Sequence, residues 1–111
     1  MQILIEEKDA ALIIKLGGHL GHASVDELNR LFDEWLGKGK YNMIVDLTDL
    51  QYISSAVLRC LLQAASKIYK LDGKIILCGL QPEVRQIFNV SGFTSFFPIY
   101  DTLAKALAHI A

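Results

Sequence analysis

The stretch "MIVDLTDLQYISSAVLRCLL" (Met43–Leu62) decides the fold, because an apolar strand pattern changes within it to a helical pattern. Its first part belongs to a predicted strand, "YNMIVDL", that runs from Tyr41 to about Leu47. A linking segment, "TDLQYIS", then leads to a helix predicted from about Ser55 to Leu71. A strand that gives way to a helix over this length is typical of an α/β domain.

Before this stretch, the runs "ILIE" and "ALIIKL" predict two strands that form a hairpin with a tight turn. A Gly-rich connection, "LGGHLGH", leads into a predicted helix, "SVDELNRLFDEWLGKG". Ser24 and Glu27 have the spacing of a capping box at the start of this helix.

After the stretch, "KIILCGL" predicts a strand that is covered on both faces, because all but its first residue are apolar or glycine. A short helix is expected from Pro82, followed by a final strand "FFPIY" at the sheet edge and a last helix capped by Asp101. The order is therefore ββαβαβαβα. It predicts one α/β domain over residues 1–111, with a mixed, mostly parallel sheet of about five strands packed with about four helices.

Composition excludes several classes of function. The chain has 111 residues, 52% of them hydrophobic, which favours an ordered core over disorder. A formal net charge of −1 provides no field to attract nucleic acid or an anionic membrane. No apolar run approaches the roughly 20 residues of a membrane span, and the acidic start "MQILIEEKD" does not resemble a signal peptide. We therefore expect a cytoplasmic protein without membrane insertion.

The residue types that often carry catalysis or bind metals lack the spacing that such chemistry needs. Cys60 and Cys78 have no C-x-x-C spacing, and we expect both to be reduced thiols in the core. His19 and His22 lie three residues apart, His109 is remote, and no cysteine pair or carboxylate cluster completes a zinc site. "GGHLGH" lacks the spacing of a phosphate-binding loop. The sequence therefore predicts no metal and no cofactor.

Ser54 and Ser55 occupy the predicted start of the second helix, and two interpretations remain open. Serine is among the best N-cap residues, so either hydroxyl is able to accept a hydrogen bond from a free amide of the first turn. The same amides and the positive end of the helix dipole also accommodate a phosphate, so a phosphoserine there need not unfold the helix. Neither serine lies in the G-x-S-x-G motif of a hydrolase.

The chain resembles a known family over nearly its whole length. "MIVDLTDLQYISSAVLRCLL" and the later "DGKIILCGLQPEVRQIFNVSGFTSFFPIYDTLAKAL" are similar to the STAS domain of bacterial anti-sigma-factor antagonists. The resemblance implies an adaptor and not an enzyme. Its partner would be an anti-sigma factor that is an ATP-dependent serine kinase. Phosphorylation by this kinase would end the complex, and a serine phosphatase would restore it.

The resemblance also implies which residue is phosphorylated. The family pattern at the switch is Asp-Ser-x-Gly-Leu-Gly, with the serine as the acceptor. On this chain the acceptor falls on Ser55, the variable position on Ala56 and the leucine on Leu58.

Four positions depart from this pattern. Ser54 stands at the position of the Asp, Val57 and Arg59 at the two glycines, and Gly21 where a second acid is often found. A variant, Ile-Ser-Ser-Ala-Gly-Leu-Arg, occurs in the same family, and against it only Val57 differs. An outward Val57 would reshape a partner groove, whereas an inward Val57 would fill core space.

The expected partner surface is centred on Ser55 and includes the Gly18–Ser24 connection. Its members are Ser54, Ala56, Val57, Arg59, Gly21 and His22. A phosphate on Ser55 would act at this surface, by repelling the partner.

Two further interpretations compete with the phosphorylation switch. One is a STAS module without a switch, such as a scaffold of a stress-signalling complex or the small subunit of a lipid-transport ATPase. The other is a small thiol or serine enzyme, which would place Cys60, Cys78 or Ser55 in a pocket beside a histidine. The apolar segment "FTSFFPIY" is compatible with a homodimer in either case.

Overall fold

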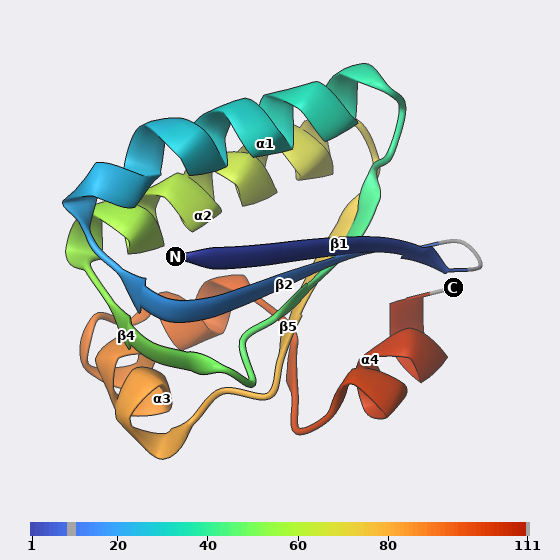
Figure 1. Cartoon of the computed structure of the whole chain (residues 1–111). Coiled ribbons are helices and arrows are strands. Elements are labelled where there is room, and N and C mark those ends of the chain that lie inside the picture. Colours follow the sequence, from blue (N-terminus) through green and yellow to red (C-terminus); the bar gives the residue numbers. More distant parts are fainter. Residues whose placement is uncertain (9–10, 111) are drawn as a thin grey trace.

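The structure is a computed structural model that describes residues 1–8 and 11–110. It forms a sheet with α1 and α2 side by side on one face and α4 on the other (Figure 1). α3 lies against β4, beside the main sheet. In chain order the elements are β1 (Gln2–Lys8), β2 (Ala11–Leu20), the 3-10 turn η1 (His22–Ser24), α1 (Val25–Gly37), β3 (Asn42–Asp46), β4 (Leu50–Ile53), α2 (Ser55–Lys70), β5 (Lys74–Cys78), α3 (Pro82–Val90), the 3-10 turn η2 (Phe93–Phe96), β6 (Ile99–Tyr100) and α4 (Leu103–Ile110).

The sheet topology confirms the predicted α/β class. Strands lie in the order β1-β2-β3-β5-β6, and β4 pairs with β2 outside this path. β1 and β2 form the expected antiparallel hairpin, from the pair Gln2↔Gly17 to the pair Lys8↔Ala11. The predicted tight turn falls on residues 9 and 10, which lie outside the described residues. Every other strand pairing is parallel, and β6 lies at the edge, where Pro98 was expected.

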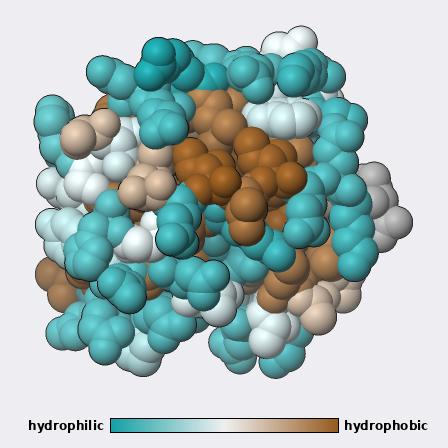
Figure 2. Space-filling view, in the orientation of Figure 1, coloured by the Kyte–Doolittle hydropathy of each residue, from teal (hydrophilic) through white to brown (hydrophobic). Residues whose placement is uncertain are grey.

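The core has a part on each face of the sheet because strand side chains alternate between the two faces. On β5, Ile75 and Leu77 belong to the larger cluster with α1, α2 and α3, whereas Ile76 and Cys78 belong to the smaller cluster with α4. The prediction that this strand is covered on both faces is therefore confirmed. Figure 2 shows hydrophobic side chains gathered on the face where β1 runs below α1.

The connection between β3 and α2 differs from the prediction. "TDLQYIS" was expected to be a linker, but residues Leu50–Ile53 form the parallel strand β4 beside the end of β2. The Gly-rich connection was also placed too early, because β2 continues to Leu20. A register shift between Gly18 and His19, with Gly18 at a φ of +82°, lets β2 turn from β3 toward β4. A four-residue strand that pairs at a bulge has little periodicity for sequence analysis to detect.

The two predicted helix caps differ from the structure in different ways. Ser24 is the N-cap residue of α1 as predicted, but it has helical backbone angles and makes no side-chain capping bond, so there is no capping box with Glu27. At α4 the cap is Thr102 in place of Asp101, and its Oγ1 accepts a hydrogen bond from the amide of Lys105 at 3.1 Å.

The second helix forms where expected. Leu58, Leu61, Ala65 and Ile68 are buried on its inner face, whereas Leu62 is half-buried and Tyr69 is 46% exposed. The remaining buried residues of α2 are Val57, Cys60 and Ala64. Within residues 1–8 and 11–110, every helix is too short or too polar to span a bilayer.

Candidate functional site

The junction between β4 and α2 is held by the backbone before the helix begins. Ile53 of β4 pairs with Leu20 of β2, and the amide of Ser54 donates a hydrogen bond to the carbonyl of Leu20 at 2.8 Å. Ser54 has extended backbone angles, and its Oγ accepts a hydrogen bond from the amide of Val57 at 3.3 Å. Ser54 is therefore the N-cap of α2, and the capping interpretation holds for this serine.

Ser55 is the first residue of α2, and its side chain is exposed to solvent. The side-chain cap of α2 comes from Ser54, which accepts from the amide of Val57, and not from Ser55. No acidic residue lies in the first turn of α2. The hydroxyl is thus open to a second protein, beside the positive end of a 16-residue helix.

Sequence analysis assigned three residues after Ser55 to the partner surface. They differ in burial in the structure. Val57 is fully buried, so it fills core space and does not reshape an outer groove. Ala56 is half-buried, whereas Arg59 is exposed on the next turn of the helix. Val57 is therefore removed from the expected contact surface, and the other two remain on it.

Gly21 and His22 lie close to the junction because they directly follow Leu20, the residue of β2 that pairs with Ile53 and accepts the hydrogen bond from Ser54. Leu20 pairs with Ile53, so Gly21 leaves β2 at the level where Ser54 leaves β4. The turn η1, which begins at His22, contacts α2. His22 is exposed, and a Cβ on Gly21 would meet no atom within 4 Å. The backbone would therefore accept an acidic side chain at position 21.

An aromatic pair beside the junction was not predicted. The rings of His19 on β2 and Tyr52 on β4 lie with their centroids 6.2 Å apart, and Tyr52 is 45% exposed. Sequence analysis assigned His19 to a loop and Tyr52 to a linker, so their pairing across two strands was missed. The only signal in the sequence was the change from the polar His19 to the apolar Leu20 at the end of this strand.

The two thiols are buried and poorly suited to nucleophilic chemistry. Burial raises the pKa of the Cys60 thiol, which donates a hydrogen bond to Asn29 Oδ1 at 3.0 Å. Burial, together with the charge of the neighbouring Asp46, raises the pKa of Cys78 to about 12. Both thiols therefore stay protonated near neutral pH.

Two of the histidines lie against aromatic rings. His109 stacks on Tyr100 with 4.5 Å between the ring centroids, and its Nδ1 lies 2.8 Å from the carbonyl oxygen of Lys105. His19 is paired with Tyr52, as described above. Across residues 1–8 and 11–110, no three His, Cys, Asp or Glu side chains gather as metal ligands. The raised pKa values of both thiols give no support to the interpretation as a thiol enzyme.

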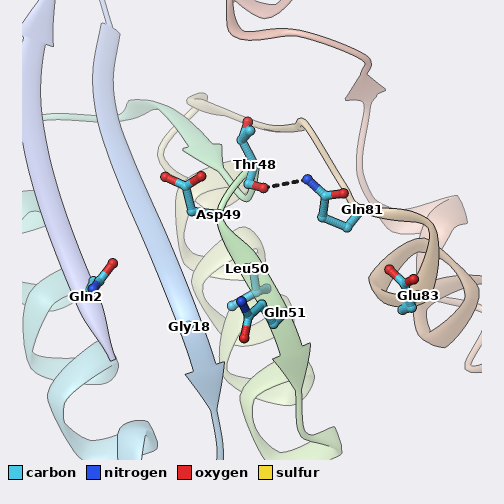
Figure 3. A pocket seen from close by; sticks show the side chains of 8 residues that line it. All are labelled: Gln2, Gly18, Thr48, Asp49, Leu50, Gln51, Gln81 and Glu83. Carbon is cyan, nitrogen blue, oxygen red and sulfur yellow. Dashed lines mark hydrogen bonds between the residues drawn. The ribbon is translucent and has the colours of Figure 1, made fainter.

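A polar hollow of about 780 Å³ lies at the opposite end of β4 from Ser55 (Figure 3). Gln81 Nε2 closes one side by donating a hydrogen bond to the carbonyl of Thr48 at 2.7 Å. Asp49 and Glu83 give the lining two carboxylates. Sequence analysis assigned no function to these residues, and Asp49 also forms part of the backbone link that holds β2 to β4 through the amide of Gly18.

Comparison with known proteins identifies the family that this chain resembles. The family model described as STAS domain matches residues 2–106. BtrV of Bordetella bronchiseptica, whose name assigns it provisionally to the anti-sigma factor antagonists, is 35% identical over 108 residues, which cover 97% of this chain and 93% of that protein. The anti-sigma F factor antagonist of Paenibacillus polymyxa is 30% identical over 111 residues, covering 99% and 95% of the two chains.

A solved structure has the same fold. SpoIIAA, the Bacillus cell fate determinant, in its phosphorylated form superimposes with a TM-score of 0.78 at 20% sequence identity. The alignment covers 99% of this chain and 100% of SpoIIAA.

Proposed function

This chain belongs to the STAS domain family, and we propose that it is an anti-sigma factor antagonist switched by phosphorylation of Ser55. In its unmodified form it binds an anti-sigma factor that is also a serine kinase, and phosphorylation ends the complex. The observation that carries this proposal is the exposed Ser55 at the start of α2, next to a separate residue that caps the helix. The names of the BtrV and Paenibacillus relatives support the same class of function.

The geometry favours Ser55 over Ser54 as the phosphoacceptor. Ser54 is half-buried and its Oγ accepts the capping hydrogen bond, so its reaction would cost the helix its cap. Ser55 is exposed. In the proposed reaction this oxygen attacks the γ-phosphorus of ATP and loses its proton, while the bond to the β-phosphate oxygen breaks and ADP leaves.

The phosphate acts on binding without unfolding the domain. It adds about −1.5 to −2 charge at the positive end of the α2 dipole, where the helix tolerates an anion. The core beneath it is formed by Val57 and Leu58, whose burial does not change when the exposed oxygen is modified. The effect is therefore confined to the partner surface. There the new charge repels the docked protein, or loses its water of hydration on docking at a cost in binding free energy. A phosphorylated structure of SpoIIAA, with the same fold, supports this view.

The partner surface comprises Ser55, Ser54, Ala56, Arg59, Gly21 and His22, with Val57 now excluded. A serine phosphatase is expected to reset the switch by hydrolysing the phosphoserine. Such a cycle operates where sigma factors act, so we expect the protein in the cytoplasm. Ser54 and Gly21, which stand at positions where the family pattern has acids, favour a second candidate, a STAS module that binds partners without a switch.

Phosphorylation separates the two candidates. The purified chain is incubated with MgATP and each anti-sigma serine kinase of its source genome in turn, and its intact mass is measured. We expect one kinase to add a single phosphate to wild type and to Ser54→Ala, but none to Ser55→Ala. A module without a switch would gain no phosphate from any of these kinases.

Binding by isothermal titration calorimetry tests the switch itself. Ser55→Asp should weaken binding to the cognate kinase by about 10-fold or more, equivalent to about 1.4 kcal/mol. Ser66→Asp is the matched control because Ser66 is exposed farther along the same helix. If Ser55→Asp and Ser55→Ala both bind as well as wild type, the assignment of the switch is wrong.

A further inference from the structure

Arg59 is an exposed cation near the start of α2. No ion pair to Arg59 is formed by the residues that the structure describes, whereas Lys67, two turns later, pairs with Asp33 at 2.9 Å. A cation near a helix N-terminus also gains nothing from the helix dipole, which favours anions there. The position therefore holds an arginine that neither an internal ion pair nor the helix stabilises.

Arg59 is placed to reach a group on Ser55. The two residues are four positions apart in one helix and are both exposed, so they share a face with about 5–6 Å between their Cβ atoms. Long helical side chains lean toward the N-terminus and cover the preceding turn. The guanidinium of Arg59 is thus able to lie over the Ser55 oxygen, and its planar fork matches two oxygens of a phosphate.

We propose, building on the function proposed above, that Arg59 reads the phosphorylation state of Ser55. When Ser55 is unmodified, the guanidinium pairs with a carboxylate of the anti-sigma factor. When Ser55 carries a phosphate, the guanidinium turns to that phosphate within the same helix. The modification then has two effects, because it adds negative charge and also withdraws a cation from the partner.

The surroundings of Arg59 fit this role. At the two positions where the family pattern has acids, this chain has Ser54 and Gly21, and the first turn of α2 contains no acidic residue. Carboxylates at those positions would compete with both the partner and the phosphate for the guanidinium. Their replacement by neutral residues leaves Arg59 available to either anion.

The phosphate contact is measured on the full chain with phosphoserine incorporated genetically at position 55, so no kinase is needed. A pH titration followed by ³¹P NMR gives the second pKa of this phosphate, which is about 6 without special contacts. We expect Arg59→Gln to raise it by about 0.3 relative to wild type, and Arg59→Lys to restore part of the difference. His22 is unchanged in all of these variants and therefore does not contribute to the differences between them.

Lys70→Gln is the matched control. It removes one exposed positive charge from the same helix, at a distance of about 22 Å along the axis from Ser55. Its phosphate should titrate as in wild type. Equal titration of the Arg59→Gln and Lys70→Gln proteins would overturn the intramolecular contact.

The partner contact is measured by calorimetry with the unphosphorylated chain and its anti-sigma factor. Arg59→Glu should weaken binding by about 10-fold or more, and Lys70→Glu by less than about 2-fold. Equal affinity of these two variants would refute the role of Arg59 in binding while leaving the proposed function intact. If no anti-sigma factor binds the wild type, the proposed function itself fails, and the ³¹P titration still decides the phosphate contact.

Discussion

Replacement of Val57 by glycine tests whether this residue belongs to the core. The switch pattern that the sequence resembles has glycine at this position, yet we expect the substitution to destabilise this chain. The Val57 side chain is fully buried in the larger core cluster, beside Leu58 and Leu61. In this protein the position has become part of the packing beneath the switch.

The structure gives the size of the effect. A fully buried valine side chain contributes about 1.5–3 kcal/mol relative to an exposed one. The lower helix propensity of glycine adds about 0.4 kcal/mol relative to valine. Val57→Gly should therefore lower the free energy of unfolding by about 2–3 kcal/mol, with a fall in Tm of about 10 °C.

Urea unfolding followed by circular dichroism measures this difference against a matched control. Ala56→Gly changes the neighbouring residue, which is half-buried, and should cost only about 0.5–1 kcal/mol from backbone effects. The difference between the two variants isolates the burial of the valine side chain. If Val57→Gly costs no more than Ala56→Gly, Val57 does not fill the core, and the exclusion of this residue from the partner surface is wrong.

Four further substitutions test other parts of the structure. Ser54→Ala should cost about 1 kcal/mol of stability through loss of the cap, and Ser55→Ala less than about 0.5 kcal/mol; equal costs in urea unfolding would contradict the division of roles between the serines. Gly73→Ala should cost about 1–3 kcal/mol because the new Cβ would collide with the carbonyl oxygen of Tyr41, and an unchanged Tm would show that the backbone gives way there. For Cys78 the folded-state pKa of about 12 lies above the ordinary value of 9.0, so its contribution is intact below pH 9 and declines by about 1.4 kcal/mol per pH unit above it. The difference in unfolding free energy between wild type and Cys78→Ala should therefore shrink between pH 8 and pH 10.5, and a constant difference would refute the raised pKa.

Long periodic segments made most of the fold predictable from the sequence. The face of α1 with Leu28 and Phe32 repeats at helical spacing, and the strand "KIILC" is apolar after its first residue, so both were identified in type and position. β4 was not, because its four residues pair only with a bulged strand end, and this partner is visible only in three dimensions. Local patterns do not record such a pairing.

The candidate site was predictable to a similar extent. The position of Ser55 at a helix start follows from the change of pattern at Ser54, and the structure confirms it. The burial of Val57 was not decided by the sequence, because a residue in the first turn lies near the boundary between the inner and outer faces of the helix. The pairing of His19 with Tyr52 depends on β4 and was missed for the same reason as the strand.

The placement of β4 outside the central sheet has a consequence for how such a domain diversifies. Gln51 and Tyr52 of this short strand are exposed, as is Arg59 of α2, whereas Leu50, Ile53, Val57 and Leu58 are buried. Exchanges at these three exposed positions therefore leave the scaffold intact. A domain of this kind is free to change what it binds without any change to its interior.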